Sequence, residues 1–294
     1  MSLIPDLIYD REKLRSQIKK WKWLFVIALL VIVLNKDYKK NEEDYIARIN
    51  LEGVILHDQD LIKELELIKD NSKIKGLIVH IDSPGGSSFA GEELYETLKK
   101  IKAVKPVVSV LGTVAASGGY MVALASDHIV ARNRTITGSI GVLFQSFEAV
   151  ELAKKLGIKF VSFKSSPYKA APNPMEEVTL EVREATMENI NDSYDIFVNI
   201  LMEGRKMPKE KAIKLANGKT YIGKRAKELN LIDEIGGEEE AIKFLETKKN
   251  VSKNLSIVDI EWGNSSSFVE ELTKFIHNSN VMIKYFINYS SQLN

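Results

Sequence analysis

Ser117 stands in a run of small residues, "VAASGGY", that joins two apolar segments. A serine between a strand and a helix is most often an N-cap, which accepts a hydrogen bond from a backbone N–H of the first helical turn. The same turn can instead present the hydroxyl at the carboxyl edge of a sheet, where small neighbours let a substrate backbone approach. The N–H of Gly118 would then face an oxyanion. The pattern A-A-S-G-G differs from the G-x-S-x-G turn of α/β-hydrolases, so these residues alone leave both interpretations open.

A serine nucleophile needs a general base, and the histidines of the chain are poorly suited to that role. His80 lies inside the apolar run "GLIVHI", and His128 begins a strand soon after Ser117. His57 and His277 have no motif around them. A lysine can replace histidine only when it is neutral, and lowering a lysine pKa by about three units from its usual value of about 10.4 costs roughly 4 kcal/mol. Composition and spacing do not select one lysine among the many.

The composition excludes several other kinds of chemistry. The 294 residues include 41 basic and 40 acidic side chains, and this balance gives no reason to expect a nucleic-acid partner. There is no cysteine, which excludes zinc–thiolate sites, thiol catalysis and disulfides. We expect no metal and no cofactor. The length suits one globular domain, or one domain with extensions.

Strands and helices alternate around Ser117. Apolar, β-branched runs predict strands at residues 45–56, 76–81, 105–111, 128–133 and 158–163. Helical spacing of apolar residues predicts helices at residues 60–70, 90–101, 148–157 and 179–207, with another directly after Ser117. Residues 209–218 and 224–237 each predict a helix followed by a turn that glycine closes. Short connections between alternating strands and helices predict an α/β fold built from βαβ units, with a parallel sheet and helices packed around it.

The N-terminal part predicts a membrane anchor. Residues 21–34, "WKWLFVIALLVIVL", are almost purely apolar and follow a basic segment. At about 1.5 Å per residue they reach about 21 Å, short of a roughly 30 Å bilayer core, so a secretory signal is an alternative. Flanking Trp and Lys side chains favour an uncleaved anchor at residues 21–36, and a buried helix would show a polar stripe. The excess of Lys and Arg before the span predicts a cytoplasmic N-terminus and an extracytoplasmic remainder.

Five stretches together resemble the signal peptide peptidase A family of membrane-anchored serine proteases. In chain order they are "DSPGGS" at 82, "GTVAASGGYMVALASD" at 112, "ITGSIGV" at 136, "SSPYKAAPNP" at 165 and "YIGKRAKELNLIDEIGG" at 221. The resemblance covers roughly residues 44 to 245 and implies a Clp/crotonase-like fold. One segment departs from the family pattern, because members commonly continue the lysine segment with Asp and Gly-Ser-Pro where this chain has "KAAPNP". We interpret the departure as a changed loop that keeps its base.

The resemblance also implies a role for each matching residue. Ser117 corresponds to the family's nucleophile and Lys169 to its general base. Ser139 corresponds to a helper serine that hydrogen-bonds the lysine. The backbone N–H groups of Gly86 and Gly118 correspond to the oxyanion donors. Taken one at a time, these residues have ordinary structural explanations as turn glycines, a loop serine and a surface lysine, but those explanations fit the whole set poorly.

Further expectations follow from the same resemblance. Pro84 and Gly85 would line an extended substrate that adds a strand beside the P-G-G segment. The Clp proteases share the P-G-G and serine elements but use a downstream histidine, and the corresponding position here is Val142. Family members cleave signal peptides that have already been released, and other exposed apolar peptides. They assemble as rings in which neighbouring protomers supply the serine and the lysine.

These observations predict four parts of the chain and leave two other functions open. The parts are a basic segment (1–20), the anchor (21–36), a Ser-Lys peptidase domain (37–246) and a C-terminal extension without an assigned role (247–294). The crotonase-like superfold also hosts acyl-CoA enzymes, and fold alone does not decide function. A membrane anchor is unusual for that chemistry. A catalytically inactive membrane scaffold is the other alternative, and the intact Ser117, Lys169 and Ser139 count against it.

Overall fold

The structure is a computed structural model that describes residues 20–23, 25–27 and 43–263. The chain divides into two units, residues 1–44 and 45–294. Most of the predicted anchor at 21–36 lies outside the described residues, and the described part of it is helical and exposed. Among the residues described, no helix combines the length and apolar character needed to cross a membrane. The anchor therefore stays a prediction.

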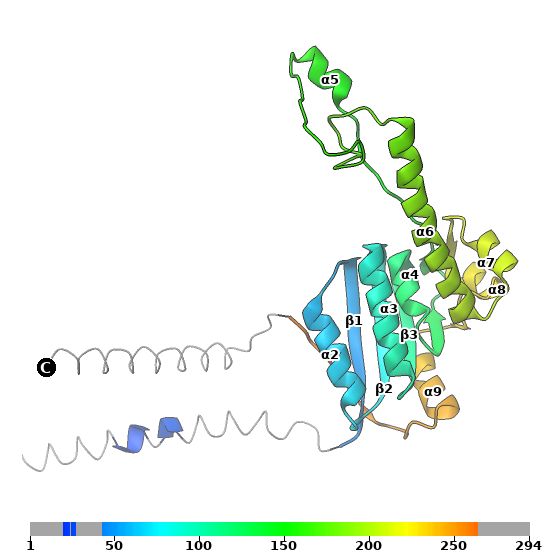
Figure 1. Ribbon diagram of the computed structural model, residues 1–294. Helices are drawn as coiled ribbons and strands as arrows, with labels where there is room; N and C mark the ends of the chain where they lie inside the picture. The colour runs from blue at the N-terminus through cyan, green and yellow to red at the C-terminus, as the bar shows by residue number, and fades with distance from the viewer. Residues whose placement is uncertain (1–19, 24, 28–42, 264–294) are drawn as a thin grey trace, which may run out of the picture. The chain divides into compact units, whose positions relative to one another are not determined.

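A mostly parallel sheet organises the second unit (Figure 1). Its strands are β1 (Tyr45–Ile55), β2 (Ile74–Gly86), β3 (Val107–Ala116), β4 (His128–Ala131), β5 (Ile136–Gly138), β6 (Thr220–Ile222), β7 (Glu234–Ile235) and β8 (Ser256–Asp259). The main path of the sheet runs β6-β5-β3-β2-β1-β8, and β4 lies between β3 and β7. Among the strands that the structure describes, only β5 and β6 pair antiparallel. The carboxyl ends of β1, β2, β3 and β5 thus share one edge, where ligands bind in open α/β sheets.

Helices cover both faces of this sheet. They are α2 (Gln59–Asp70), α3 (Ser88–Lys102), α4 (Gly118–Ala123), α5 (Val150–Lys155), α6 (Leu180–Arg205), α7 (Lys209–Leu215), α8 (Gly223–Glu228) and α9 (Glu238–Lys248). On one face, α2, α3, α4 and α6 enclose the larger hydrophobic core. On the other face, α9 packs Ala241 and Leu245 against Ile46, Ile78 and Val108. Burial from both sides explains why β2 and β3 are nearly continuous apolar runs.

The predicted α/β class and parallel sheet are confirmed, with one wrong element. The sequence predicts a strand at residues 158–163, but no described strand pairs with these residues. Their apolar side chains are mostly exposed, and Phe163 is 97% exposed. A β-branched run becomes a strand only where a partner strand and a core are available, and this segment has neither within the described chain.

The C-terminal part contributes a strand that the sequence pattern did not predict. β8 pairs in parallel with the first half of β1, from Tyr45↔Ser256 to Arg48↔Asp259. Arg48 joins the two strands further, because its guanidinium donates to Asp259 at 2.6 and 2.8 Å. The indole N–H of Trp262 then donates to Asp58 at 3.1 Å. The sheet therefore extends beyond residue 246.

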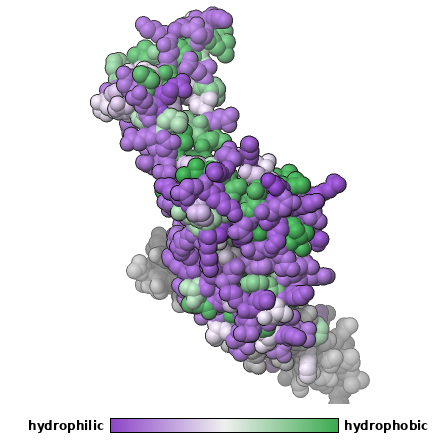
Figure 2. Space-filling view, turned by 90° about the vertical axis from the view of Figure 1, so that its right-hand side faces the viewer, coloured by the Kyte–Doolittle hydropathy of each residue, from purple (hydrophilic) through white to green (hydrophobic). Residues whose placement is uncertain are grey.

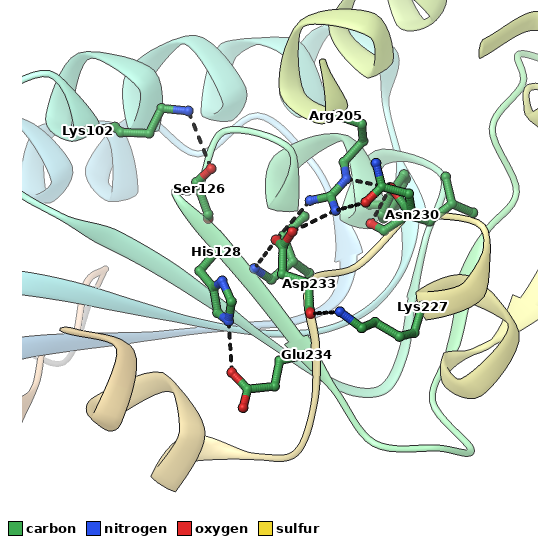
Figure 3. A network of polar contacts seen from close by, with 11 residues as sticks. Lys102, Ser126, His128, Arg205, Lys227, Asn230, Asp233 and Glu234 are labelled. Atoms are coloured by element: carbon green, nitrogen blue, oxygen red, sulfur yellow. Dashed lines mark hydrogen bonds and ion pairs between the residues drawn. The ribbon is translucent and has the colours of Figure 1, made fainter. Parts of the chain in front are cut away.

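An ion pair between a buried arginine and a partly buried aspartate joins α6 to the segment that precedes β7 (Figure 3). Arg205 donates to the two carboxylate oxygens of Asp233 at 2.8 and 2.7 Å, and to the carbonyl oxygen of Asn230 at 2.7 Å. Only 6% of the Arg205 side chain is exposed. Asp233 also accepts a hydrogen bond from the backbone of Ile129 in β4, at 2.8 Å. Burial raises the pKa of Asp233, but the hydrogen bonds and charge of Arg205 outweigh it and hold that pKa below its usual value.

Replacement of Arg205 by alanine should lower the free energy of unfolding by about 2–3 kcal/mol, because it leaves a partly buried carboxylate without its partner. The lowered pKa of Asp233 gives the effect a pH dependence. Its stabilising contribution is complete above the unfolded pKa of about 4 and is lost as the pH falls through the lower folded value. Urea unfolding at pH 7 and at pH 3 measures both effects.

The matched control for this prediction is Arg225→Ala. Arg225 forms an ion pair with Glu228 at 2.6 Å, but the two side chains are 58% and 49% exposed. We expect a loss below about 1 kcal/mol for this exposed pair. Equal losses for Arg205→Ala and Arg225→Ala at pH 7 would contradict a larger contribution of the Arg205–Asp233 pair.

Candidate active site

Ser117 occupies a strained turn between β3 and α4. Its backbone has φ 52° and ψ −121°, a conformation that costs a non-glycine residue of order 1–3 kcal/mol. Two hydrogen bonds hold the turn, one from the Ser117 N–H to the carbonyl of Gly138 and one from the Met121 N–H to the carbonyl of Ser117, each 2.9 Å long. A strained serine at a strand-to-helix turn is the backbone arrangement of a nucleophile elbow.

The side chain of Ser117 does not act as an N-cap. The residue precedes α4, but its hydroxyl makes no capping hydrogen bond to the helix. A capping serine has extended φ and ψ angles, which aim its oxygen at the first-turn N–H groups. The left-handed φ of Ser117 aims the side chain elsewhere. Ser117 is half-buried, whereas Ala115, Ala116, Gly118 and Gly119 around it are buried.

The P-G-G turn at the end of β2 packs directly on this serine. Gly85 has φ +104°, and a methyl group there would lie 2.8 Å from both the Gly118 nitrogen and the Ser117 Cβ. A methyl group on Gly118 would in turn come within 3.3 Å of the Gly86 nitrogen. The two predicted oxyanion donors, Gly86 and Gly118, therefore lie beside each other and beside Ser117. Gly118 is the first residue of α4, where an N–H has no acceptor within the helix.

Ser83 holds the P-G-G turn in place, and sequence reasoning did not single it out. It is fully buried, and its hydroxyl accepts a hydrogen bond of 3.0 Å from the Gly85 N–H. Pro84 and Gly86, on either side of Gly85, are exposed. The only signal in the sequence was a serine before Pro-Gly-Gly, a position that is also common in ordinary turns.

Ser139 lies next to Ser117 across two neighbouring parallel strands. The register of β3 with β5 pairs Ala116 with Gly138, so the two serines are the next residues on each strand. Adjacent strands are about 4.8 Å apart. Ser139 has φ 51°, close to the φ of Ser117, and it is half-buried. The structure therefore brings together Ser117, Ser139 and the two glycine N–H groups.

Lys169 lies apart from this cluster, on a segment that we call the arm (residues 142–179). In Figure 1 the arm extends away from the sheet and includes α5. Lys169 is exposed. Its ammonium group makes no hydrogen bond or ion pair with any residue that the structure describes. Within one chain, the structure does not bring Lys169 to Ser117.

Side chains that the sequence interpretation did not use fix the turn around Lys169. The side-chain amide of Asn173 donates to the carbonyl of Ala170 at 3.0 Å and to Glu176 at 2.8 Å. Glu176 also accepts from Lys164, and hydrogen bonds from Lys164 and Ser162 lower the pKa of Glu176 to about 2. Asn173 belongs to the "KAAPNP" segment that departs from the family pattern. The hydrogen bonds of its side chain therefore stabilise the conformation of this loop.

The described histidines lie far from Ser117 or pair with glutamate. His128 stands opposite Val108 on β3, nine residues before Ser117, which is about 30 Å of strand. His80 stands opposite Val110 and bonds Glu238 at 2.8 Å. His57 follows β1, two strands away from β3, and bonds Glu93 at 2.7 Å. None of the three is positioned as a base for Ser117.

The geometry can perform nucleophilic chemistry on a carbonyl group. A strained serine, two adjacent backbone N–H groups and a second serine meet at the carboxyl edge of a parallel sheet. Among the described residues, no cluster of three or more His, Asp or Glu side chains could hold a metal ion. Fold and site together define an α/β protein with the serine-hydrolase arrangement.

Comparisons with known proteins identify the family. The sequence model of peptidase family S49 matches residues 99–252, and that of the Clp proteases matches residues 49–138. A protein of Methanocaldococcus jannaschii named as a protease is 40% identical over 200 residues, covering 68% of this chain and 63% of that protein. A Synechocystis protein named as a protease is 35% identical over 212 residues, covering 71% of this chain and 76% of that protein. The chain belongs to peptidase family S49, the family of signal peptide peptidase A.

Two further proteins are similar to this chain. "Serine protease SPPA, chloroplastic" of Arabidopsis thaliana is 32% identical over 229 residues, covering 77% of this chain and 34% of that protein. The chain thus spans about a third to three quarters of the length of these relatives. A solved ClpP1 variant from Listeria monocytogenes has a TM-score of 0.44 and 17% identity, covering 66% of this chain and 92% of that one.

Proposed function

We propose that this protein is a serine endopeptidase with a Ser-Lys dyad, which hydrolyses cleaved signal peptides and other apolar peptides. The observation that carries the proposal is the strained turn at Ser117, packed against the Gly85–Gly86 turn. Membership of peptidase family S49 supports peptide hydrolysis over acyl-CoA chemistry. The intact serine cluster supports an enzyme over an inactive scaffold.

The proposed mechanism uses an acyl-enzyme. Lys169 in its neutral form removes the proton of the Ser117 hydroxyl as the oxygen attacks the peptide carbonyl. The N–H groups of Gly86 and Gly118 stabilise the oxyanion, an effect worth about 3 kcal/mol for each donor. Lys169 gives the proton to the leaving amine and then activates the water that hydrolyses the ester. Ser139 donates a hydrogen bond that orients the lysine.

We propose that a neighbouring copy of the chain in a ring supplies Lys169. Two observations support an active site shared between copies. Lys169 has no partner within the described chain, and the arm that carries it exposes many apolar side chains (Figure 2). The large hydrophobic residues that are half exposed or more are Leu143, Phe144, Phe147, Leu152, Leu156, Ile158, Phe160, Val161, Phe163 and Tyr168. Such dense apolar exposure is typical of a surface that another protein covers.

The proposal places the enzyme in the cell membrane. Residues 21–36 would anchor the chain as a single span with the N-terminus in the cytoplasm and the peptidase domain outside. Apolar peptides released in the bilayer would then meet the site close to where they arise. The basic segment before the span and its flanking Trp and Lys residues support this topology.

A test of the substrate class uses the full-length protein in detergent with two quenched fluorescent peptides of equal length. One carries an apolar signal-like core, and the other replaces that core with Ser, Gln and Gly. We expect kcat/KM to be at least about tenfold higher for the apolar peptide, because side-chain burial in the site favours it. Equal rates would overturn the apolar preference. Hydrolysis of neither peptide would count against the peptidase proposal itself.

A further inference from the structure

The turn that carries Ser139 is shaped by a strand from a distant part of the sequence. β6 pairs antiparallel with β5, so that Gly138 stands opposite Thr220 and Thr137 opposite Tyr221. The N–H of Ser139 donates to the carbonyl of Lys219 at 2.8 Å, and the N–H of Gly218 donates to the carbonyl of Ile140 at 3.0 Å. The backbone before and after Ser139 is thus bonded to residues 218–219.

The ring of Tyr221 completes this support. Gly138 has φ +85°, and a methyl group there would lie 2.8 Å from the Cδ2 of Tyr221 and 3.0 Å from the carbonyl oxygen of Lys219. The ring therefore covers Gly138 on the side where any other residue would carry its Cβ. Tyr221 is partly buried against the main core. Its hydroxyl makes no hydrogen bond to a described residue, so the contact with Gly138 is made by the aromatic ring.

The same turn reaches the nucleophile through one hydrogen bond. The carbonyl of Gly138 accepts the 2.9 Å bond from the Ser117 N–H. A change in the backbone of Gly138 therefore shifts both serines. Ser139 directly follows Gly138, and Ser117 is hydrogen-bonded to it. Both serines have left-handed φ angles. Packing interactions of this kind fix a reacting group to within a fraction of an ångström, and a misplacement of about 1 Å can reduce a rate about 100-fold.

We propose that Tyr221 is a positioning residue for Ser117 and Ser139, with its ring holding the Gly138 turn between them. The inference rests on the proposed function, since it assigns Tyr221 to that same site. The proposed role of Tyr221 connects the "YIG" at the start of the C-terminal motif to the active site. No residue of that motif would touch the substrate.

The test compares Tyr221→Ala and Tyr221→Phe in the full-length protein. We expect Tyr221→Ala to lower kcat for the apolar peptide about 10- to 100-fold with KM within about twofold of wild type, because geometry and not binding is lost. Labelling of Ser117 by a fluorophosphonate should slow in parallel. Tyr221→Phe keeps the ring and should match wild type in both measurements. Ile222→Ala is the matched control, because Ile222 is the next residue of β6 and its side chain is 51% exposed.

The outcomes separate this inference from the proposed function. An active wild-type protein whose Tyr221→Ala variant keeps its kcat overturns the positioning role alone. A loss of activity in Tyr221→Phe overturns it as well, since the ring is still present. If thermal melting shows that Tyr221→Ala does not fold, Tyr221→Leu replaces it and must still show the kcat loss. A wild-type protein that neither cleaves peptides nor reacts with the fluorophosphonate overturns the proposed function, and the inference with it.

Discussion

Replacement of Ser117 by alanine should reduce peptide hydrolysis at least about 10,000-fold, because it removes the atom that forms the acyl-enzyme. The variant should fold normally. Alanine at φ 52° suffers the same backbone strain as serine, and the serine hydroxyl makes no capping hydrogen bond that would be lost. The rate of hydrolysis of the apolar quenched peptide and the thermal melting of the two proteins measure both expectations.

Ser87→Ala is the matched control for this prediction. Ser87 stands at the strand-to-helix turn after β2 and also makes no side-chain capping bond, but its φ is −62°. The variant should keep most of the activity, since an unstrained serine at a similar turn does not carry the reaction. A folded Ser117→Ala protein that retains hydrolysis would remove Ser117 from the mechanism.

Replacement of Lys169 by alanine should abolish activity in a homogeneous preparation and allow recovery in a mixture. A ring that contains both Ser117→Ala and Lys169→Ala protomers has some sites with an intact serine from one copy and an intact lysine from its neighbour. With random assembly of equal amounts, about a quarter of all sites are complete, one half multiplied by one half. We therefore expect up to about a quarter of wild-type activity after the two variants are co-assembled.

A control variant and a pH profile accompany the mixing experiment. Lys159→Ala removes another exposed lysine of the arm and should leave activity unchanged.

Wild-type activity should also rise with pH, because only the neutral amine of a lysine accepts the serine proton. Mixed oligomers that are verified by affinity tags and still show no hydrolysis would mean that each dyad forms within one chain. A flat rate between pH 6 and 10, with chemistry limiting, would argue against a lysine base.

Much of the fold could be predicted from the sequence, because its signals are local. The apolar run of β2 predicts a strand buried on both faces, and the periodicity of α3 predicts one apolar helical face. The wrong strand at residues 158–163 shows the limit of such signals. Its β-branched composition is the same whether or not a partner strand is present, and only long-range pairing decides between the two outcomes.

The sequence by itself determined which residues could do chemistry at this site. The small residues around Ser117 and the pair of glycines after Pro84 are local features, and each is visible without a structure. Only the tertiary structure decided how they meet. The left-handed φ of Ser117, the contact of Gly85 with Gly118 and the ring of Tyr221 over Gly138 arise where distant segments pack together. Sequence patterns report on neighbours along the chain, whereas the register of strands and the packing between them set these distances.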